Sequence, residues 1–161
     1  MKIAISYFYH IRFFKPYMLP ISTAVWDPKW YHKFQGDDKV FLDKNHVVNG
    51  LRVPILSPGT TCEGLCRGVE NCISKNPNEC AFLMEYEKQL NLIDFDLMMK
   101  GLEQSAMKLK SMLKFEEEPL MVLMVYEKPD NPCSERTALI KWFGEHGVEL
   151  QELKYPVSDN Y

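Results

Sequence analysis

Residues 120–126, Leu-Met-Val-Leu-Met-Val-Tyr, are the stretch that most limits how this chain can fold. Seven consecutive apolar residues leave no polar face, so they predict a strand buried on both sides in the middle of a parallel sheet. Residues 2–8 and 18–25 have strand patterns of their own. Apolar residues recur at helical spacing over 82–113 and again over 137–146. This order predicts an α/β fold, a mostly parallel Rossmann-like sheet with helices on both faces.

Local signals predict where several of these elements begin and end. Asp94 is expected to cap the helix that follows it, and Gly147 suits the position just after the last helix. Residues 148–153 alternate between apolar and polar side chains, as a final edge strand would. Asn49-Gly50 lies between two short apolar runs and therefore predicts a tight hairpin.

The composition is that of one globular domain. With 161 residues, 46% of them hydrophobic, the chain is expected to form a single α/β domain over residues 1–161. No apolar run approaches the roughly 18–20 residues of a membrane helix, and the N-terminus leads directly into a strand pattern, so we expect a cytoplasmic protein with no membrane partner. Residues 1–52 carry 8 Lys/Arg against 4 Asp/Glu. This excess could face a small anionic ligand or simply be solvated, but it forms no dense stripe that would predict extended nucleic-acid binding.

Four of the five cysteines lie in residues 56–80, a segment rich in Gly, Asn and Pro. Four thiolates on such a loop can bind a tetrahedral Zn²⁺, which would help to fold a segment with little core of its own. An iron–sulfur cluster, or clustered cysteines that bind nothing, are the alternatives. The expected ligands of this structural zinc site are Cys62, Cys66, Cys72 and Cys80.

The segment after residues 120–126 predicts an anion site. Asn131 is a good N-cap and Pro132 suits the first helical position, so Cys133 is expected in the first turn of a helix. A helix N-terminus favours a thiolate and attracts anions. Arg136 in the same turn opposes the helix dipole, which indicates that it has another role.

Aromatic and basic residues follow the first two predicted strands. If both strands run parallel to residues 120–126, their ends lie on the same edge of the sheet as Cys133, where open α/β sheets bind ligands. The aromatic rings could stack on a base, or they could equally cover the core at that edge. The candidate ligand-binding residues are Tyr7, His10, Arg12, Trp26, Trp30 and Ser134.

Parts of this sequence resemble a known family. The block Val125-Tyr-Glu-Lys-Pro129, the following Cys133 and a helix ending in Lys141-Trp-Phe143 resemble the family called domain of unknown function 488, as do residues 5–8, 20–22, 26–31 and 56–58. The resemblance implies a Rossmann-like three-layer fold and no established activity. The cysteine-rich loop looks like an elaboration found in a phage or bacterial subgroup. The Cys-His-Arg of the family is replaced here by Cys133-Ser134-Glu135-Arg136, so a histidine partner would have to come from His10 or His32.

Three interpretations of the Cys133–Arg136 segment follow. In the first, the chain is an enzyme that acts on a nucleotide, nucleoside or modified base, with Cys133, Glu135 and Arg136 as catalytic residues. In the second, it is a non-catalytic module that binds a nucleotide-like anion, as a sensor or as a phage decoy for a signalling nucleotide. In the third, Cys133 is an inert buried thiol and Arg136 pairs with Glu135 or Glu127 in a structural network.

Overall fold

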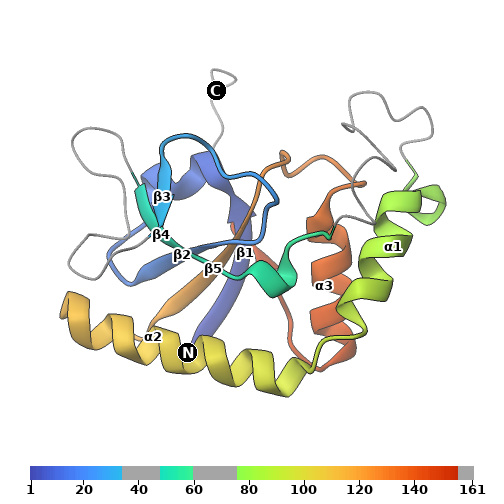
Figure 1. Cartoon of the computed structure of the whole chain (residues 1–161). Coiled ribbons are helices and arrows are strands. Elements are labelled where there is room, and N and C mark those ends of the chain that lie inside the picture. The colour runs from blue at the N-terminus through green and yellow to red at the C-terminus, as the bar shows by residue number, and fades with distance from the viewer. Residues whose placement is uncertain (34–47, 60–75, 156–161) are drawn as a thin grey trace.

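The computed structural model describes residues 1–33, 48–59 and 76–155 (Figure 1). Six strands form a sheet in the order β3-β4-β2-β5-β1-β6, and every pairing in it is parallel. The strands are β1 (Lys2–Tyr7), β2 (Met18–Ser22), β3 (Tyr31–Lys33), β4 (Val48–Arg52), β5 (Leu120–Val125) and β6 (Gln151–Glu152). The helices are α1 (Ala81–Leu90), α2 (Phe95–Leu113) and α3 (Glu135–Glu145), with short 3₁₀ turns η1 (Phe8–Phe13), η2 (Pro54–Leu56) and η4 (Pro77–Glu79).

Strand β5 lies in the interior of the sheet, as its unbroken apolar run predicts. It pairs along its whole length with β1, from Leu120 opposite Lys2 to Val125 opposite Tyr7. On its other side it pairs with β2. Residues 121–125 have no exposed surface, so both faces of the strand are covered. The predicted parallel α/β sheet is therefore confirmed.

The two faces of the sheet are covered differently. Side chains of α1, α2 and α3 pack with Met121, Leu123 and Val125 in the larger core cluster. The opposite face carries the 3₁₀ turn η1 and loop aromatics, which pack with Val122 and Met124. Figure 1 shows α2 running along the sheet and α1 beside α3.

Several predicted element ends are confirmed. The Asp94 carboxylate accepts a hydrogen bond from the Leu97 amide at 3.0 Å and so caps α2. Gly147 has a φ of 78° just after α3, in the left-handed region that glycine enters without strain. The predicted final edge strand is present as β6, which is only two residues long and pairs with β1.

The hairpin predicted at Asn49-Gly50 is wrong. Both residues lie inside β4, which runs parallel to β2 and β3. The Tyr31 ring lies against Gly50, where any Cβ would overlap it, and the Tyr31 hydroxyl donates hydrogen bonds to the carbonyl oxygens of Leu51 at 2.6 Å and Pro20 at 3.1 Å. The glycine therefore makes room for a buried ring in a strand and does not form a turn.

Candidate functional site

Buried polar side chains gather at one edge of the sheet. We call this the carboxyl edge, meaning the carboxyl ends of β1, β2 and β5 together with residues 8–13, 23–27 and 126–136. Within the described part of the chain, the buried polar or charged residues are Ser6, His10, Ser22, Thr23, Ser134, Glu135 and Arg136, and all of them lie at this edge. Polar groups are costly to bury, so a concentration in one place indicates a site or a structural network.

The chain connections change direction at this edge of the sheet. The segment that leaves β1 forms η1 on one face of the sheet, whereas the segment that leaves the adjacent β5 leads to α3 on the other face. The direction of the connections therefore reverses between β1 and β5. Open α/β sheets bind ligands outside the carboxyl ends of the strands at such a switch point.

Helix α3 begins later than the sequence predicts. Its N-cap is Ser134, whose Oγ accepts the Arg136 amide at 3.2 Å, and its first residue is Glu135. Asn131 is also a capping residue, but its side chain accepts the Cys133 amide at 3.0 Å and stabilises a turn before the helix. The prediction that Pro132 and Cys133 begin the helix is therefore wrong.

Because α3 begins at Glu135, Cys133 lies outside the helix. Its side chain is 2% exposed and belongs to the larger apolar core cluster, two residues before the helix begins. A thiol in that position is shielded from solvent and does not lie in the first turn of α3. The structure thus places Cys133 with the core and not with the polar groups around it.

Arg136 connects α3 to the loop after β5 and to strand β6. Its guanidinium is 5% exposed and donates to the carbonyl oxygen of Lys128 at 2.6 Å through Nη1 and to that of Glu127 at 2.9 Å through Nη2. Its Nε donates to Glu152 Oε2 at 3.1 Å, which pairs the helix with the edge strand β6. All three guanidinium nitrogens therefore already donate to protein acceptors. Arg136 does pair with a glutamate, but the partner is Glu152 and not the expected Glu135 or Glu127.

Glu135 is the most unusual ionisable group at this edge. Its side chain is buried, it makes no ion pair within the described residues, and Oε1 lies 3.5 Å from the Thr23 hydroxyl. Burial first, and then the nearby charge of Glu127, raise the pKa of Glu135 well above its usual value. Glu127 itself is only half-buried and accepts a hydrogen bond from Ser134 Oγ at 3.2 Å. Two carboxyl groups in different environments are thus close enough to influence each other.

His10 lies on the other side of the same edge. Its Nδ1 shares a hydrogen bond with Ser6 Oγ at 3.1 Å, and its Nε2 is buried with no partner in the described structure. Burial first, and then the positive charge of Arg136, lower the pKa of His10. Burial and the nearby arginine therefore both disfavour the charged form of the ring. The turn η1 that carries His10 packs on the face of the sheet opposite the core cluster that contains Cys133.

The aromatic candidates form a group at the ends of β1 and β2. The Tyr7 and Tyr9 ring centroids lie 5.2 Å apart, and those of Tyr9 and Trp30 lie 5.6 Å apart. Tyr7 is 5% exposed, whereas Trp26 is 80% exposed. Arg12 is exposed, and its Nε donates to the Tyr9 carbonyl oxygen at 3.1 Å. Some of these rings cover the core as the alternative interpretation proposed, while Trp26 faces solvent.

Two residues at or next to this edge, Thr23 and Arg52, were not predicted from the sequence. Arg52, at the end of β4, donates to the carbonyl oxygens of Ala24 at 2.7 Å and Val25 at 2.9 Å. Thr23 lies 3.2 Å from the Met124 carbonyl oxygen and connects β2 to Glu135. Neither residue belongs to a recognisable motif. Arg52 contacts a residue 27 positions away in the chain, and Thr23 contacts one more than 100 positions away.

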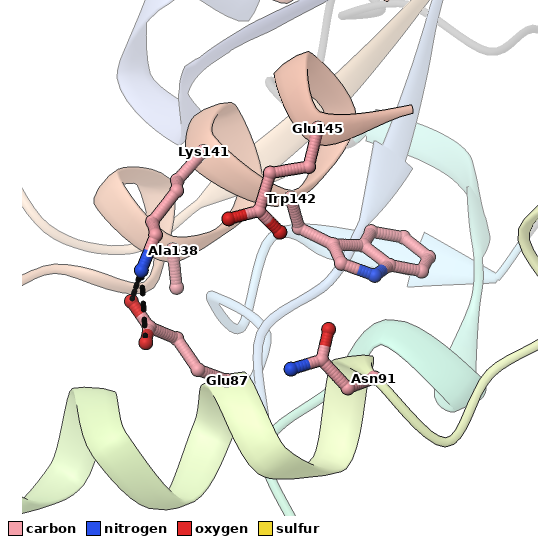
Figure 2. A pocket seen from close by; sticks show the side chains of 6 residues that line it. All are labelled: Glu87, Asn91, Ala138, Lys141, Trp142 and Glu145. Atoms are coloured by element: carbon pink, nitrogen blue, oxygen red, sulfur yellow. Dashed lines mark hydrogen bonds and ion pairs between the residues drawn. The ribbon is translucent and has the colours of Figure 1, made fainter. Parts of the chain in front are cut away.

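A groove between α1 and α3 is a separate feature (Figure 2). It is lined by Glu87, Asn91, Ala138, Lys141, Trp142 and Glu145 and contains about 220 Å³ of empty space, part of it open to solvent. The Trp142 Nε1 is buried without a partner in the described residues, and Figure 2 shows the indole and the Asn91 carboxamide facing the same space. Ligand pockets usually hold about 300–1,000 Å³, so this groove suits ordered water better than a nucleotide.

The predicted metal site lies largely outside the described residues. Cys62, Cys66 and Cys72 fall in residues 60–75, which the structure does not describe, so the zinc and iron–sulfur predictions stay predictions. Cys80 is described, is 3% exposed and is the N-cap residue just before α1. Over residues 1–33, 48–59 and 76–155, no group of three or more His, Cys, Asp or Glu side chains is arranged to hold a metal.

Comparisons of this chain with protein-family models, with curated proteins and with solved structures give no match. The resemblance to the domain of unknown function 488 family therefore stays an expectation from the sequence. In the parts of the chain that the structure describes, no helix is both long and apolar enough to span a membrane.

Proposed function

We propose that this chain binds a nucleoside- or nucleotide-like small molecule at the carboxyl edge. One observation carries this proposal: the seven buried polar residues of the described structure lie at the carboxyl edge, which contains the switch point between β1 and β5. Ligand sites on open α/β sheets lie at this position.

The exposed side chains around the edge support the choice of ligand. Trp26 and Tyr126 are 80% and 54% exposed and offer ring faces on which a base can stack. Arg12 and Lys128 are exposed at the same edge and provide cations for a phosphate. Arg136 does not take that role in our proposal, because its donors are used within the protein.

A second candidate function, acid–base catalysis on the bound ligand, is favoured by Glu135. Burial and the neighbouring Glu127 make it retain its proton at pH values where an exposed glutamate is ionised. Perturbed carboxyl pairs of this kind are common among catalytic acids and bases. Cys133 is not the nucleophile in this proposal, because its thiol lies in the apolar core.

Calorimetric titration with adenosine, cytidine and their 5′-monophosphates tests the binding proposal. We expect at least one compound to bind the wild-type protein, and mass spectrometry of the incubated mixture then shows whether it is chemically changed. Glu135→Gln keeps the shape of the side chain and removes the acid, so unchanged binding with lost turnover would identify an enzyme. Glu103→Gln, at an exposed position on α2, is the matched control. If none of the four compounds binds, the proposal is refuted.

A further inference from the structure

The loop after β2 is held by several side-chain hydrogen bonds. The Ser22 hydroxyl donates to the Asp27 carboxylate across the loop and accepts the Ala24 amide at 3.3 Å. Ser57 Oγ donates to the Ala24 carbonyl oxygen at 3.2 Å. These contacts fix both ends and the middle of a segment that has no regular secondary structure.

Arg52 provides the central part of this bracing. One of its nitrogens, Nη2, donates to the Ala24 and Val25 carbonyl oxygens at 2.7 Å and 2.9 Å. The other, Nη1, lies 3.8 Å from Asp27 Oδ2. A planar guanidinium can hold two carbonyls and a carboxylate in a fixed geometry, which a lysine ammonium cannot reproduce. Arg52 therefore determines the path of residues 24–27.

The residue that this rigid loop presents is exposed. Trp26 has 80% of its surface exposed, although tryptophan is highly buried on average. A flexible loop would allow the indole to fold back onto the protein and bury its apolar surface. The bonds of Arg52 to the carbonyl immediately before Trp26, and to the one before that, hold the main chain from which the indole projects. The same loop begins at Thr23, whose hydroxyl lies 3.5 Å from Glu135.

We propose that Arg52 is a positioning residue that holds the Ser22–Asp27 loop so that Trp26 forms a preorganised platform for the planar ring of the ligand. This inference rests on the function proposed above and assigns the ring of the ligand to Trp26. A platform that is already ordered avoids the entropic cost of fixing a loop on binding. Stacking on an aromatic side chain depends on the ring face, so the platform accepts purines and pyrimidines alike.

The first measurement follows Trp26 without any ligand. The chain has three tryptophans, and Trp30→Phe with Trp142→Phe leaves Trp26 as the only indole. In that background, time-resolved fluorescence anisotropy should show little local motion of Trp26. Arg52→Met should increase this motion, and Arg52→Lys should do so to a smaller extent because the charge remains. Lys29→Met removes a neighbouring exposed cation and should change nothing.

The second measurement uses adenosine and adenosine 5′-monophosphate as probes in calorimetric titrations. Trp26→Ala and Arg52→Met should each weaken binding about tenfold or more, as expected for the loss of one stacked base. Lys29→Met should bind adenosine as the wild type does. Circular dichroism checks that each variant is folded, and Arg52→Lys replaces Arg52→Met if the latter is not.

The outcomes separate this inference from the proposed function. If the wild type binds a probe and the Trp26 and Arg52 variants bind it equally well, the positioning role is refuted while the function stands. If the wild type binds neither these probes nor the cytidine compounds, the function itself fails and the platform fails with it. If Arg52→Met leaves the motion of Trp26 unchanged, the claim that Arg52 holds the loop is wrong whatever binds.

Discussion

Replacing Arg136 by methionine tests how the carboxyl edge is held together. The substitution keeps most of the aliphatic side chain and removes a guanidinium that is only 5% exposed. Two main-chain carbonyls and the carboxylate of Glu152 then lose their donor. A hydrogen bond to a charged group contributes about 1.5–3 kcal/mol, and removing one partner of a buried ion pair costs about 3–5 kcal/mol. We therefore expect the free energy of unfolding to fall by about 3–5 kcal/mol.

Urea denaturation monitored by circular dichroism measures this change, and the melting temperature should fall by roughly 6–20 °C for a chain of this size. Arg12→Met is the matched control, because it removes a guanidinium of the same kind from an exposed position. The control should cost less than about 1 kcal/mol. A loss below about 1 kcal/mol for Arg136→Met would show that the observed contacts do not stabilise the edge, and the reasoning would be wrong.

Three further substitutions test other parts of the structure. Burial raises the pKa of Glu135, so the folded protein retains a proton that the unfolded chain releases, and wild-type stability should fall as the pH rises above about 4.5. Glu135→Gln should remove that decline in urea titrations at pH 5 and pH 8; an identical slope in both proteins would contradict the burial argument. Asp94→Ala should lower the free energy of unfolding by about 1 kcal/mol because it removes the cap of α2, whereas Asp96→Ala in the same turn should lower it less. Equal losses of stability in the two variants would contradict the capping role of Asp94. Gly147→Ala should lower stability by about 1 kcal/mol because the φ of Gly147 is positive, while Gly144→Ala inside α3 should raise stability. Thermal melts in which both substitutions change the melting temperature in the same direction would exclude this explanation.

The sequence predicted those features that depend on one segment at a time. Residues 120–125 are apolar without interruption, so their central place in a parallel sheet followed from burial alone. Asp94 and Gly147 act within a few residues of their own position, and the structure confirms both. Local capping and local periodicity are physical rules that need no tertiary information.

The errors occurred where two local signals competed or where a distant residue decided the outcome. Asn131 and Ser134 are both good N-caps, and the sequence alone gave no reason to prefer Ser134 as the start of α3. At Asn49-Gly50, the deciding residue is Tyr31, which needs the space above Gly50 and lies 19 positions earlier. A hairpin propensity cannot compete with the burial of a tyrosine ring.

The partners of the buried charges were the hardest part to predict, because they come from separate segments. Thr23 and Glu135 are 112 residues apart, and Arg136 and Glu152 belong to different layers of the fold. Composition shows that glutamates and arginines are present but not which of them lose contact with water. Only the assembled sheet shows that they meet at one edge.

The contacts of Arg136 separate two roles that the sequence had combined. Anion binding and catalysis were both predicted for the Cys133–Arg136 segment, yet the arginine is bound to the main chain and Cys133 lies in the core. The groups that a ligand can reach at the carboxyl edge include the half-buried Glu127 and the exposed ring of Trp26. If the proposed function is correct, Arg136 should affect the ligand only through the shape of the edge. Arg136→Lys should then weaken ligand binding in proportion to its loss of stability, whereas Trp26→Ala should weaken binding with no loss of stability.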